Sequence, residues 1–302
     1  VGFVYSNTVA CTMDYKICEH FDAAYGWEYR PFKYKGHDLE ECVSFAPIPA
    51  AVSRIWYAPN HLRAFRRSTY NEVGGHNREM KVLDDLDLMC RIYITSKFHH
   101  IDKPLYLYRV HGDNSWITNN KEIQDNVYKI YGKYIEDMVI KWATDNGLKV
   151  IDLGGRFNKD RRYLSVDLKD ADIIADLREK WPFGDGTVGV VRAFDIFEHL
   201  DDPLHTMQEL YRVLSPAGYA FITVPSTDGR GAFQDPTHVS YWNENSFLYY
   251  TNRNWARYID SPVQFQPLWL FTTEMNEMKV CWVVAHLLKQ YPGLRIPGLK
   301  FI

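Results

Sequence analysis

Five short apolar segments between residues 149 and 226 constrain the fold of this chain most strongly. They are KVIDLGG (149–155), YLSVD (163–167), ADIIADL (171–177), VGVVRAFDIFEHL (188–200) and YAFITVPS (219–226). Short apolar strands that alternate with turns and helical stretches are typical of an α/β domain with a mainly parallel sheet. Open sheets of this kind bind ligands at the carboxyl ends of their strands. Polar residues end successive segments here, so we expect them to form one site.

The residues that end these segments suggest which parts of a ligand they could contact. Asp152 ends the first segment and is followed by two glycines, which permit a positive φ and a close approach of ligand to backbone. Asp167 ends the second, where a carboxylate can accept hydrogen bonds from both ribose hydroxyls of a nucleotide. Asp176 ends the third segment, and the fourth ends near Asp195, Glu198 and His199.

A helix is expected before the fifth segment. Asp202 is a suitable cap, Pro203 fits the first helical position, and Pro216 and Gly218 end the pattern. The residues predicted to form its buried face are Leu204, Met207, Leu210, Tyr211 and Leu214.

The ordered set VIDLGG, YLSVD, ADLREKWPF, FDIFEHLDDP and ELYRVLSPAG resembles the class I S-adenosylmethionine (SAM)-dependent methyltransferases of the type 11-like kind, over about residues 147–226. The resemblance implies a Rossmann-like fold and SAM as cofactor. It places Asp152, Gly154 and Gly155 on the methionine side, Asp167 on the ribose, and Asp176 and Leu177 beside the adenine. It also implies that Phe194 and Asp195 close the pocket, with Glu198 and His199 nearby.

The sequence departs from that family at two points. Arg156 replaces the usual third glycine, and the segment between Asp152 and Asp167 is too short for the helix that normally follows the glycine loop. One hypothesis is that Arg156 neutralises the methionine carboxylate of the cofactor.

The polar and aromatic segment 226–251 is expected to hold the acceptor substrate, because elaborate loops over strand ends often carry function. His238 is the candidate general base and Asp235 its orienting partner. The alternative is that Asp235-Pro-Thr-His is a capped turn that packs Trp242. The run DPTHVSYWNENSF resembles methyltransferases of surface-polysaccharide clusters. Beyond residue 260, two apolar segments are expected to be antiparallel strands that complete the sheet, followed by a terminal tail, GLRIPGLKFI.

The first half carries a second ordered set, FRRSTYNEVGG, DDLDLMCR and YLYRVHGDNS. It resembles the C-terminal portion of family 2 glycosyltransferases with the GT-A fold, over about residues 45–116. The resemblance implies Asp85 as general base with Asp84 as partner, and His111 as a ligand of Mn or Mg or a diphosphate contact. No suitable DxD motif precedes residue 58, so nucleotide-sugar binding is expected only with a further N-terminal half.

Another interpretation is that Asp84, Asp85 and Asp87 only cap and solvate a helix. In that helix Leu86 and Met89 point inward and Arg91 pairs with an acid. In the glycosyltransferase-like interpretation, Gly74 and Gly75 are expected to make the turn under the acceptor site.

We therefore predict a partial GT-A domain at 1–118, a linking helix at 119–146 that ends before Gly147, and a methyltransferase domain at 147–302. The predicted reaction is SAM-dependent methyl transfer to a sugar hydroxyl of a surface polysaccharide or its precursor, with a glycan or lipid-linked sugar as acceptor. One alternative makes the glycosyltransferase the main activity. Another makes the second half a degenerate SAM-fold docking module.

The composition of the chain restricts which partners and which cellular location can be expected for it. The net charge of −3 gives no reason to expect nucleic acid. Five cysteines without a CxxC pair argue against a disulfide framework and favour a reducing compartment. No apolar run reaches the ~18 residues that span a bilayer. We expect a cytoplasmic protein, which a lipid-linked acceptor would bring to the inner membrane surface as a peripheral protein. The opening VGFVYSN resembles a strand already under way, which suggests a fragment.

Overall fold

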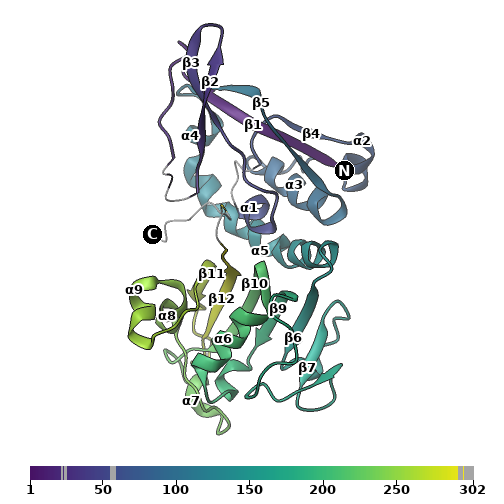
Figure 1. The fold of residues 1–302 in the computed structure, drawn as a ribbon, viewed down its shortest axis with the longest axis vertical. Coiled ribbons are helices and arrows are strands. Elements are labelled where there is room, and N and C mark those ends of the chain that lie inside the picture. The colour runs from purple at the N-terminus through teal and green to yellow at the C-terminus, as the bar shows by residue number, and fades with distance from the viewer. Residues whose placement is uncertain (22, 24–25, 55–58, 292–294, 296–302) are drawn as a thin grey trace. The chain divides into compact units, whose positions relative to one another are not determined.

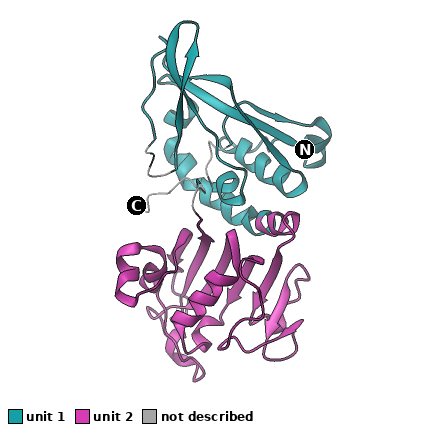
Figure 2. Ribbon diagram, viewed as in Figure 1, with its two compact units in different colours: residues 1–138, 295–302 teal, residues 139–294 magenta. Residues whose placement is uncertain are grey.

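The computed structural model describes residues 1–302 except 22, 24–25, 55–58, 292–294 and 296–302 (Figure 1). The chain forms two compact units, unit 1 from residues 1–138 with Arg295, and unit 2 from residues 139–294 (Figure 2). The expected long helix is α5, Asn120–Asp145, and Gly147 follows it with a φ of 67°. The boundary between the units falls inside α5. The helix therefore contributes to both units rather than standing apart as a linker.

Unit 2 is built on a seven-stranded sheet of order β11-β12-β10-β9-β6-β7-β8. Neighbours from β10 to β8 are parallel, and β12 is antiparallel to both β10 and β11. This is the mainly parallel sheet that the sequence predicts. Its strands are β6 Lys149–Leu153, β7 Leu164–Asp167, β8 Ile173–Ile174, β9 Val188–Phe194, β10 Leu214–Pro225, β11 Phe265–Thr272 and β12 Trp282–Lys289.

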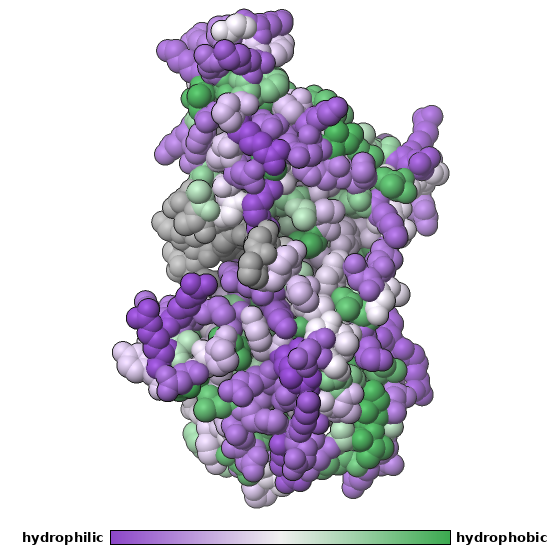
Figure 3. All heavy atoms as spheres, viewed as in Figure 1, coloured by the Kyte–Doolittle hydropathy of each residue, from purple (hydrophilic) through white to green (hydrophobic). Residues whose placement is uncertain are grey.

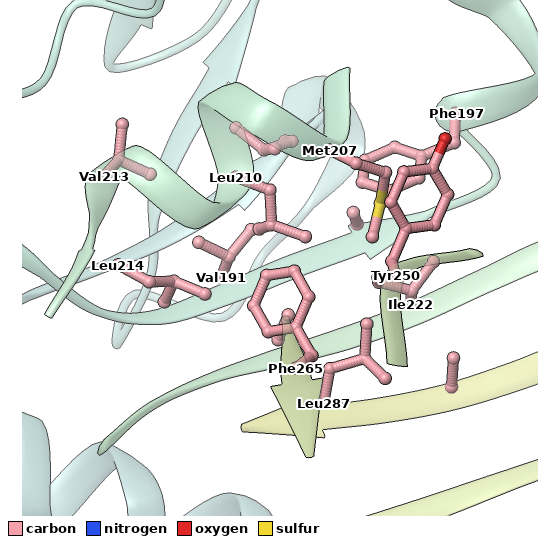
Figure 4. Packing of buried hydrophobic residues seen from close by; sticks show 14 of the residues in the cluster. Val191, Phe197, Met207, Leu210, Val213, Leu214, Ile222, Tyr250, Phe265 and Leu287 are labelled. Carbon is pink, nitrogen blue, oxygen red and sulfur yellow. The ribbon is translucent and has the colours of Figure 1, made fainter. Parts of the chain in front are cut away.

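The central strands are almost continuously apolar because both of their faces are covered. On one side α5 packs closely, since a Cβ at Gly189 of β9 would lie 2.6 Å from the Ala143 Cβ. On the core side shown in Figure 4, α6 (Pro203–Val213) packs Met207 and Leu210 near Val191 and Phe265.

Helix α6 begins as predicted, with the Asp202 side chain accepting from the His205 N–H and Pro203 in the first turn. It ends earlier than predicted. Val213 is its last residue, and β10 already begins at Leu214, where it pairs with Val188 of β9. Leu204 is 40% exposed, so its predicted place in the buried face is wrong. Leu204 instead lines a surface hollow that also includes Tyr241, Tyr249 and Ile259.

Short helical elements fill the remaining connections of unit 2. They are η2 Gly155–Phe157, η3 Phe197–His199, α7 Gly231–Gln234, η4 Glu244–Phe247, α8 Leu248–Thr251, α9 Arg253–Ala256 and η5 Arg257–Ile259. The expected strand at 171–177 is reduced to β8, two residues long. The antiparallel strands expected beyond residue 260 are β11 and β12. The expected terminal tail lies outside the described residues, except for Arg295.

Unit 1 is built around β1, Phe3–Cys11, in a five-stranded sheet. Strands β3 (His37–Cys42) and β4 (Arg63–Phe65) pair with β1 antiparallel, β5 (Phe98–Arg109) pairs with it parallel, and β2 (Tyr29–Tyr34) extends the sheet beyond β3. The β2–β3 hairpin turns through Lys35 and Gly36, both with positive φ, as a tight two-residue turn requires.

In the part of unit 1 that the structure describes, four helices besides α5 occur: α1 Pro49–Arg54, α2 Arg67–Glu72, α3 Asp84–Thr95 and α4 Ser115–Thr118. Leu86 and Met89 of α3 are buried, as predicted, against a core that also contains Ile123, Val127 and Ile130 of α5. In the described part of the chain, no helix combines the length and the apolar character needed to cross a bilayer. Hydrophilic side chains predominate on the face shown in Figure 3, and hydrophobic ones occur in small groups.

Candidate functional site

A cavity of about 250 Å³ lies in unit 2 at the carboxyl ends of the parallel strands. It is the position where sheets of this kind bind ligands. The residues that line it are Gly154, Asp167, Leu168, Ala175, Asp176, Leu177, Arg178, Ile196, His199, Leu200 and Thr237. The structure thus brings together five of the predicted cofactor residues, Gly154, Asp167, Asp176, Leu177 and His199.

Gly154 and Gly155 follow β6 in a sharp turn. Gly154 has a φ of 71°, and a Cβ there would lie 3.0 Å from the Ile196 side chain. A Cβ at Gly155 would lie 2.7 Å from a carboxylate oxygen of Asp152. The single turn of η2 replaces the usual helix, as the short spacing predicts. Glycine is required at both positions because no side chain fits between the turn and its neighbours.

Asp152 lies beneath this turn and does not line the cavity. Its two carboxylate oxygens accept hydrogen bonds from Arg192 of β9, from Nε at 3.1 Å and Nη2 at 2.9 Å. The Asp152 and Arg192 side chains are only 7% and 13% exposed. The Arg192 guanidinium also stacks on the Tyr163 ring, 4.0 Å from its centroid. Sequence reasoning missed this partner, although a lone arginine in the apolar run VGVVRAF signals a buried acid nearby.

Asp167 and Asp176 differ in their surroundings. Asp167 ends β7, and no protein group hydrogen-bonds its carboxylate within the described ranges of the chain. Asp176 accepts from Arg178 at 2.6 Å, and this hydrogen bond lowers the pKa of Asp176 to about 2. Asp167 is therefore the acid in the cavity whose oxygens remain available to a ligand.

Arg156 points away from the predicted position. Its guanidinium pairs with Asp170 at 2.8 Å and lies over the Phe157 ring, and it does not line the cavity. Phe194 and Asp195 also do not line the cavity. Ile196 takes the place expected of Phe194, because Asp195 adopts a positive φ of 51° and turns the chain after β9.

The segment after β10 folds back onto η3. The backbone N–H groups of Val239 and Ser240 both donate to the Glu198 carbonyl, at 2.8 and 3.1 Å, and Ser240 Oγ donates to the Phe197 carbonyl. Trp242 is buried and donates from Nε1 to Ser240 Oγ. These contacts hold the segment over the strand ends and bring Thr237 to the cavity wall.

His238 therefore lies beside η3, with its side chain only 7% exposed. Its Nδ1 is 3.0 Å from the Ala232 carbonyl, and its Nε2 is 4.0 Å from both Glu198 Oε1 and Asp235 Oδ2. The ring of His199 lies 5.0 Å away, centroid to centroid. A carbonyl only accepts hydrogen bonds, so Nδ1 carries the proton and Nε2 presents a lone pair.

Asp235 forms the capped turn that was the alternative interpretation. It accepts from the Thr237 N–H at 2.8 Å and from Thr237 Oγ1 at 2.7 Å. The Ala232 carbonyl, not Asp235, bonds the His238 ring. The cap uses Oδ1, whereas Oδ2 lies 4.0 Å from His238 Nε2, so the orienting role of Asp235 stays a prediction.

Glu198 is buried at 2% exposure beside this histidine. Burial, reinforced by the charges of Asp195 and Asp235, raises the pKa of Glu198 to about 8. Its Oε2 has no hydrogen-bond partner. Glu198 does not line the cavity itself, whereas its neighbour His199 does.

The three acids in the first turn of α3 each have a basic partner. Asp85 pairs with Arg63, Asp84 with His76 at 2.9 Å, and Asp87 with Arg91 at 2.7 Å, the acid predicted for that arginine. Arg91 also donates to the carbonyls of Val73 and Gly75, so it fixes the turn that carries Gly74 and Gly75.

His111 lies in an exposed turn, where it contacts Asp113 and Asn114. Among the described residues, the metal-compatible group of three consists of Glu198, His199 and His238 and does not include His111. Within the described ranges no such group includes His111, and its predicted role as a ligand stays a prediction.

A family model described as "Methyltransferase domain" matches residues 121–273 of this chain. Among proteins of curated function, none has a significantly similar sequence. Solved structures that resemble part of this chain include Haemonchus contortus phosphoethanolamine N-methyltransferase 2 in complex with S-adenosyl-L-methionine, at 14% identity and a TM-score of 0.31. The match covers 48% of this chain and 49% of that one, so this chain spans about half the length of that relative.

Two further structures resemble this chain. The YcgJ protein of Bacillus subtilis is 10% identical with a TM-score of 0.36, over 51% of this chain and 98% of that one. A SAM-dependent methyltransferase of Aquifex aeolicus is 17% identical with a TM-score of 0.29, over 49% of this chain and 89% of that one.

Proposed function

Since this chain belongs to the methyltransferase domain family, whose model matches residues 121–273, we propose that unit 2 methylates a sugar hydroxyl with SAM as donor. The acceptor in this proposal is a surface polysaccharide or its lipid-linked precursor. The observation that carries the proposal is the cavity at the strand ends, which gathers Gly154, Asp167, Asp176 and Leu177 from three separate segments.

The residues present fit the cofactor. The Asp167 carboxylate, which has no protein partner in the described part of the chain, would accept hydrogen bonds from both ribose hydroxyls. The backbone of Gly154 would approach the methionine portion, because no side chain stands there. Leu177 and Ile196 would contact the adenine with apolar surface. When bound, SAM supplies a methyl group that its own sulfonium activates.

The protein's remaining task is to align an acceptor oxygen and remove its proton. His238 presents the lone pair of Nε2, since its Nδ1 donates to the Ala232 carbonyl. A neutral imidazole is well suited to take a hydroxyl proton near neutral pH. His199 lies beside it and also lines the cavity, so the base stands next to the proposed cofactor site.

Two exposed aromatic rings support a sugar as acceptor. Phe233 and Tyr241 stack with centroids 5.3 Å apart and remain 62% and 54% exposed. They flank His238 in the same segment, and Phe233 directly follows the Ala232 carbonyl that holds the imidazole. Aromatic faces that stay open to solvent are suited to stacking against the apolar face of a sugar ring.

The first prediction concerns cofactor binding. We expect Asp167→Ala to weaken the binding of S-adenosylhomocysteine by about 10- to 100-fold, because hydrogen bonds to a charged group contribute about 1.5–3 kcal/mol. Isothermal titration measures the Kd. The control is Glu179→Ala, an exposed acid outside the cavity lining, which should bind like the wild type. Failure of the wild type itself to bind would overturn the proposal and favour a docking module.

A second prediction concerns Arg156. Its ion pair with Asp170 directs the guanidinium away from the cavity lining. We expect Arg156→Ala to change the Kd of S-adenosylhomocysteine by less than about five-fold, because Arg156 does not line the cavity. Loss of its surface ion pair should also disturb the fold little, since such pairs contribute about 0–1 kcal/mol to stability. A larger loss in the same titration would restore the hypothesis that Arg156 neutralises the methionine carboxylate.

The transfer reaction is tested with methyl-labelled SAM and a panel of methyl glycosides, nucleotide sugars and oligosaccharides. Label that survives mild alkali marks an ether, the product expected from a hydroxyl, whereas an ester would lose it. Label on no member of the panel, in a protein that binds S-adenosylhomocysteine, would contradict the sugar acceptor while leaving cofactor binding intact.

For unit 1 we propose the acceptor portion of a family 2 glycosyltransferase, active only together with a nucleotide-sugar-binding half. The favouring observation is that Asp84 and Asp85 begin α3 with side chains 43% and 42% exposed, each held by a basic residue. Asp85 would act as base there. Joining this chain to such a half and measuring metal-dependent hydrolysis of UDP-glucose, with Asp85→Asn as the variant, tests it.

A further inference from the structure

Three side chains of unit 2 form a cluster that the proposed function uses only in part. One ligand atom each from Glu198, His199 and His238 lies within 4.8 Å of the others. It is the one group of three His, Cys, Asp or Glu residues with this spacing in the part of the chain that the structure describes. Two of its members come from η3, and the third comes from the segment after α7, which is bonded back onto η3 through Val239 and Ser240.

Both imidazoles are held in a tautomer that leaves Nε2 available. His238 Nδ1 lies 3.0 Å from the Ala232 carbonyl, and His199 Nδ1 lies 3.2 Å from the Thr237 carbonyl. Carbonyls accept and cannot donate, so each Nδ1 carries the proton. A backbone carbonyl on one ring nitrogen is the usual device that orients a histidine to bind metal through the other.

Glu198 supplies the second, independent observation. Its side chain is only 3% exposed, and its Oε2 has no hydrogen-bond partner. No lysine or arginine pairs with Glu198 within the described ranges. A buried carboxylate without a partner is costly, and a cation would compensate it.

We propose that Glu198, His199 and His238 bind a divalent transition-metal cation. Ligands about 2.1 Å from such an ion stand about 3.4 Å apart in a tetrahedral site, so a bound ion would draw these atoms inward by about 1 Å. Two imidazoles with one carboxylate favour Mn, Fe, Co, Ni or Zn over Ca or Mg. Three protein ligands leave a coordination position open, as in catalytic sites.

The role of the cation rests on the proposed function, whereas its binding does not. His199 lines the cavity, so an open position on the cation would stand next to the cofactor site. A hydroxyl bound there would lose its proton more readily, because a divalent cation lowers the pKa of a bound oxygen. In the metal-loaded protein His238 then acts as a ligand, and in the metal-free protein it is the base itself.

The test is a titration of the EDTA-treated, desalted full chain with Co²⁺, followed through the visible absorption of the ion. We expect one ion per chain. Glu198→Gln and His238→Ala should each weaken binding by more than about ten-fold. His99→Ala, which removes an exposed histidine of β5, should bind like the wild type. Equal affinity in all four proteins, or no stoichiometric binding, would overturn the site.

Folding and cofactor binding are measured on the same samples. His238→Ala changes a loop residue and serves as the second variant if Glu198→Gln does not fold. Asp167→Ala should keep Co²⁺ binding while losing S-adenosylhomocysteine binding. If the protein binds S-adenosylhomocysteine but fails to bind Co²⁺, the cation site alone is overturned. If it binds Co²⁺ but fails to bind S-adenosylhomocysteine, the proposed cofactor is overturned instead.

Discussion

Replacing Arg192 with methionine is expected to lower the free energy of unfolding of unit 2 by about 3–5 kcal/mol, the usual cost of leaving a buried charge unpaired. The Asp152 side chain is 7% exposed and accepts two hydrogen bonds from this guanidinium. Methionine fills a similar volume but donates no hydrogen bond. The Asp152 carboxyl would then be buried without a partner, which is costly. Urea denaturation measures the change, and hydrogen exchange of the β9 amides assigns it to unit 2.

The double variant Asp152→Asn with Arg192→Met separates charge from packing. It removes the unpaired carboxylate, so we expect it to be more stable than Arg192→Met alone. Arg178→Met is the matched control, because its pair with Asp176 is open to solvent, with side chains 55% and 32% exposed. That control should change stability far less, since water screens the pair. An equal loss in Arg178→Met and Arg192→Met would refute the structural role of the buried pair.

The second large effect is expected at His238. Both proposed uses of its Nε2, as base and as metal ligand, require the imidazole. We therefore expect His238→Ala to lower kcat by about 100- to 10,000-fold, the range that general acid–base groups contribute. The Kd of S-adenosylhomocysteine should stay within about three-fold, because His238 does not line the cavity. The measurement is label transfer to the best acceptor of the panel.

His238→Gln distinguishes the two uses. Glutamine can accept a hydrogen bond but cannot take a proton as imidazole does, so it should not restore kcat in EDTA-treated protein. If the metal is used, added Mn²⁺ or Zn²⁺ should raise the wild-type rate and leave the variant unchanged. A wild-type rate in His238→Ala would contradict both roles.

The sequence predicted the elements of unit 2 and part of its site for a definite reason. Apolar runs bounded by turn residues specify strands locally, and a side chain that ends a parallel strand must lie at the ligand-binding edge. Asp167 and Gly154 follow from this rule alone. The cap of α6 at Asp202 is equally local, since it depends on residues three apart.

Only the tertiary structure decided which side chains meet across the chain. Arg192 reaches Asp152 from 40 residues away because β9 pairs with β6, and the strand order cannot be derived from the apolar pattern of either strand. His238 lies beside Glu198 because the segment after α7 is hydrogen-bonded to η3 through Val239 and Ser240. Arg156 forms an ion pair with Asp170, although its position after the two glycines suggested a contact with the cofactor. Local sequence therefore determined the strands and the edge where a ligand binds, whereas the pairing of charges depended on contacts that form only when distant segments pack together.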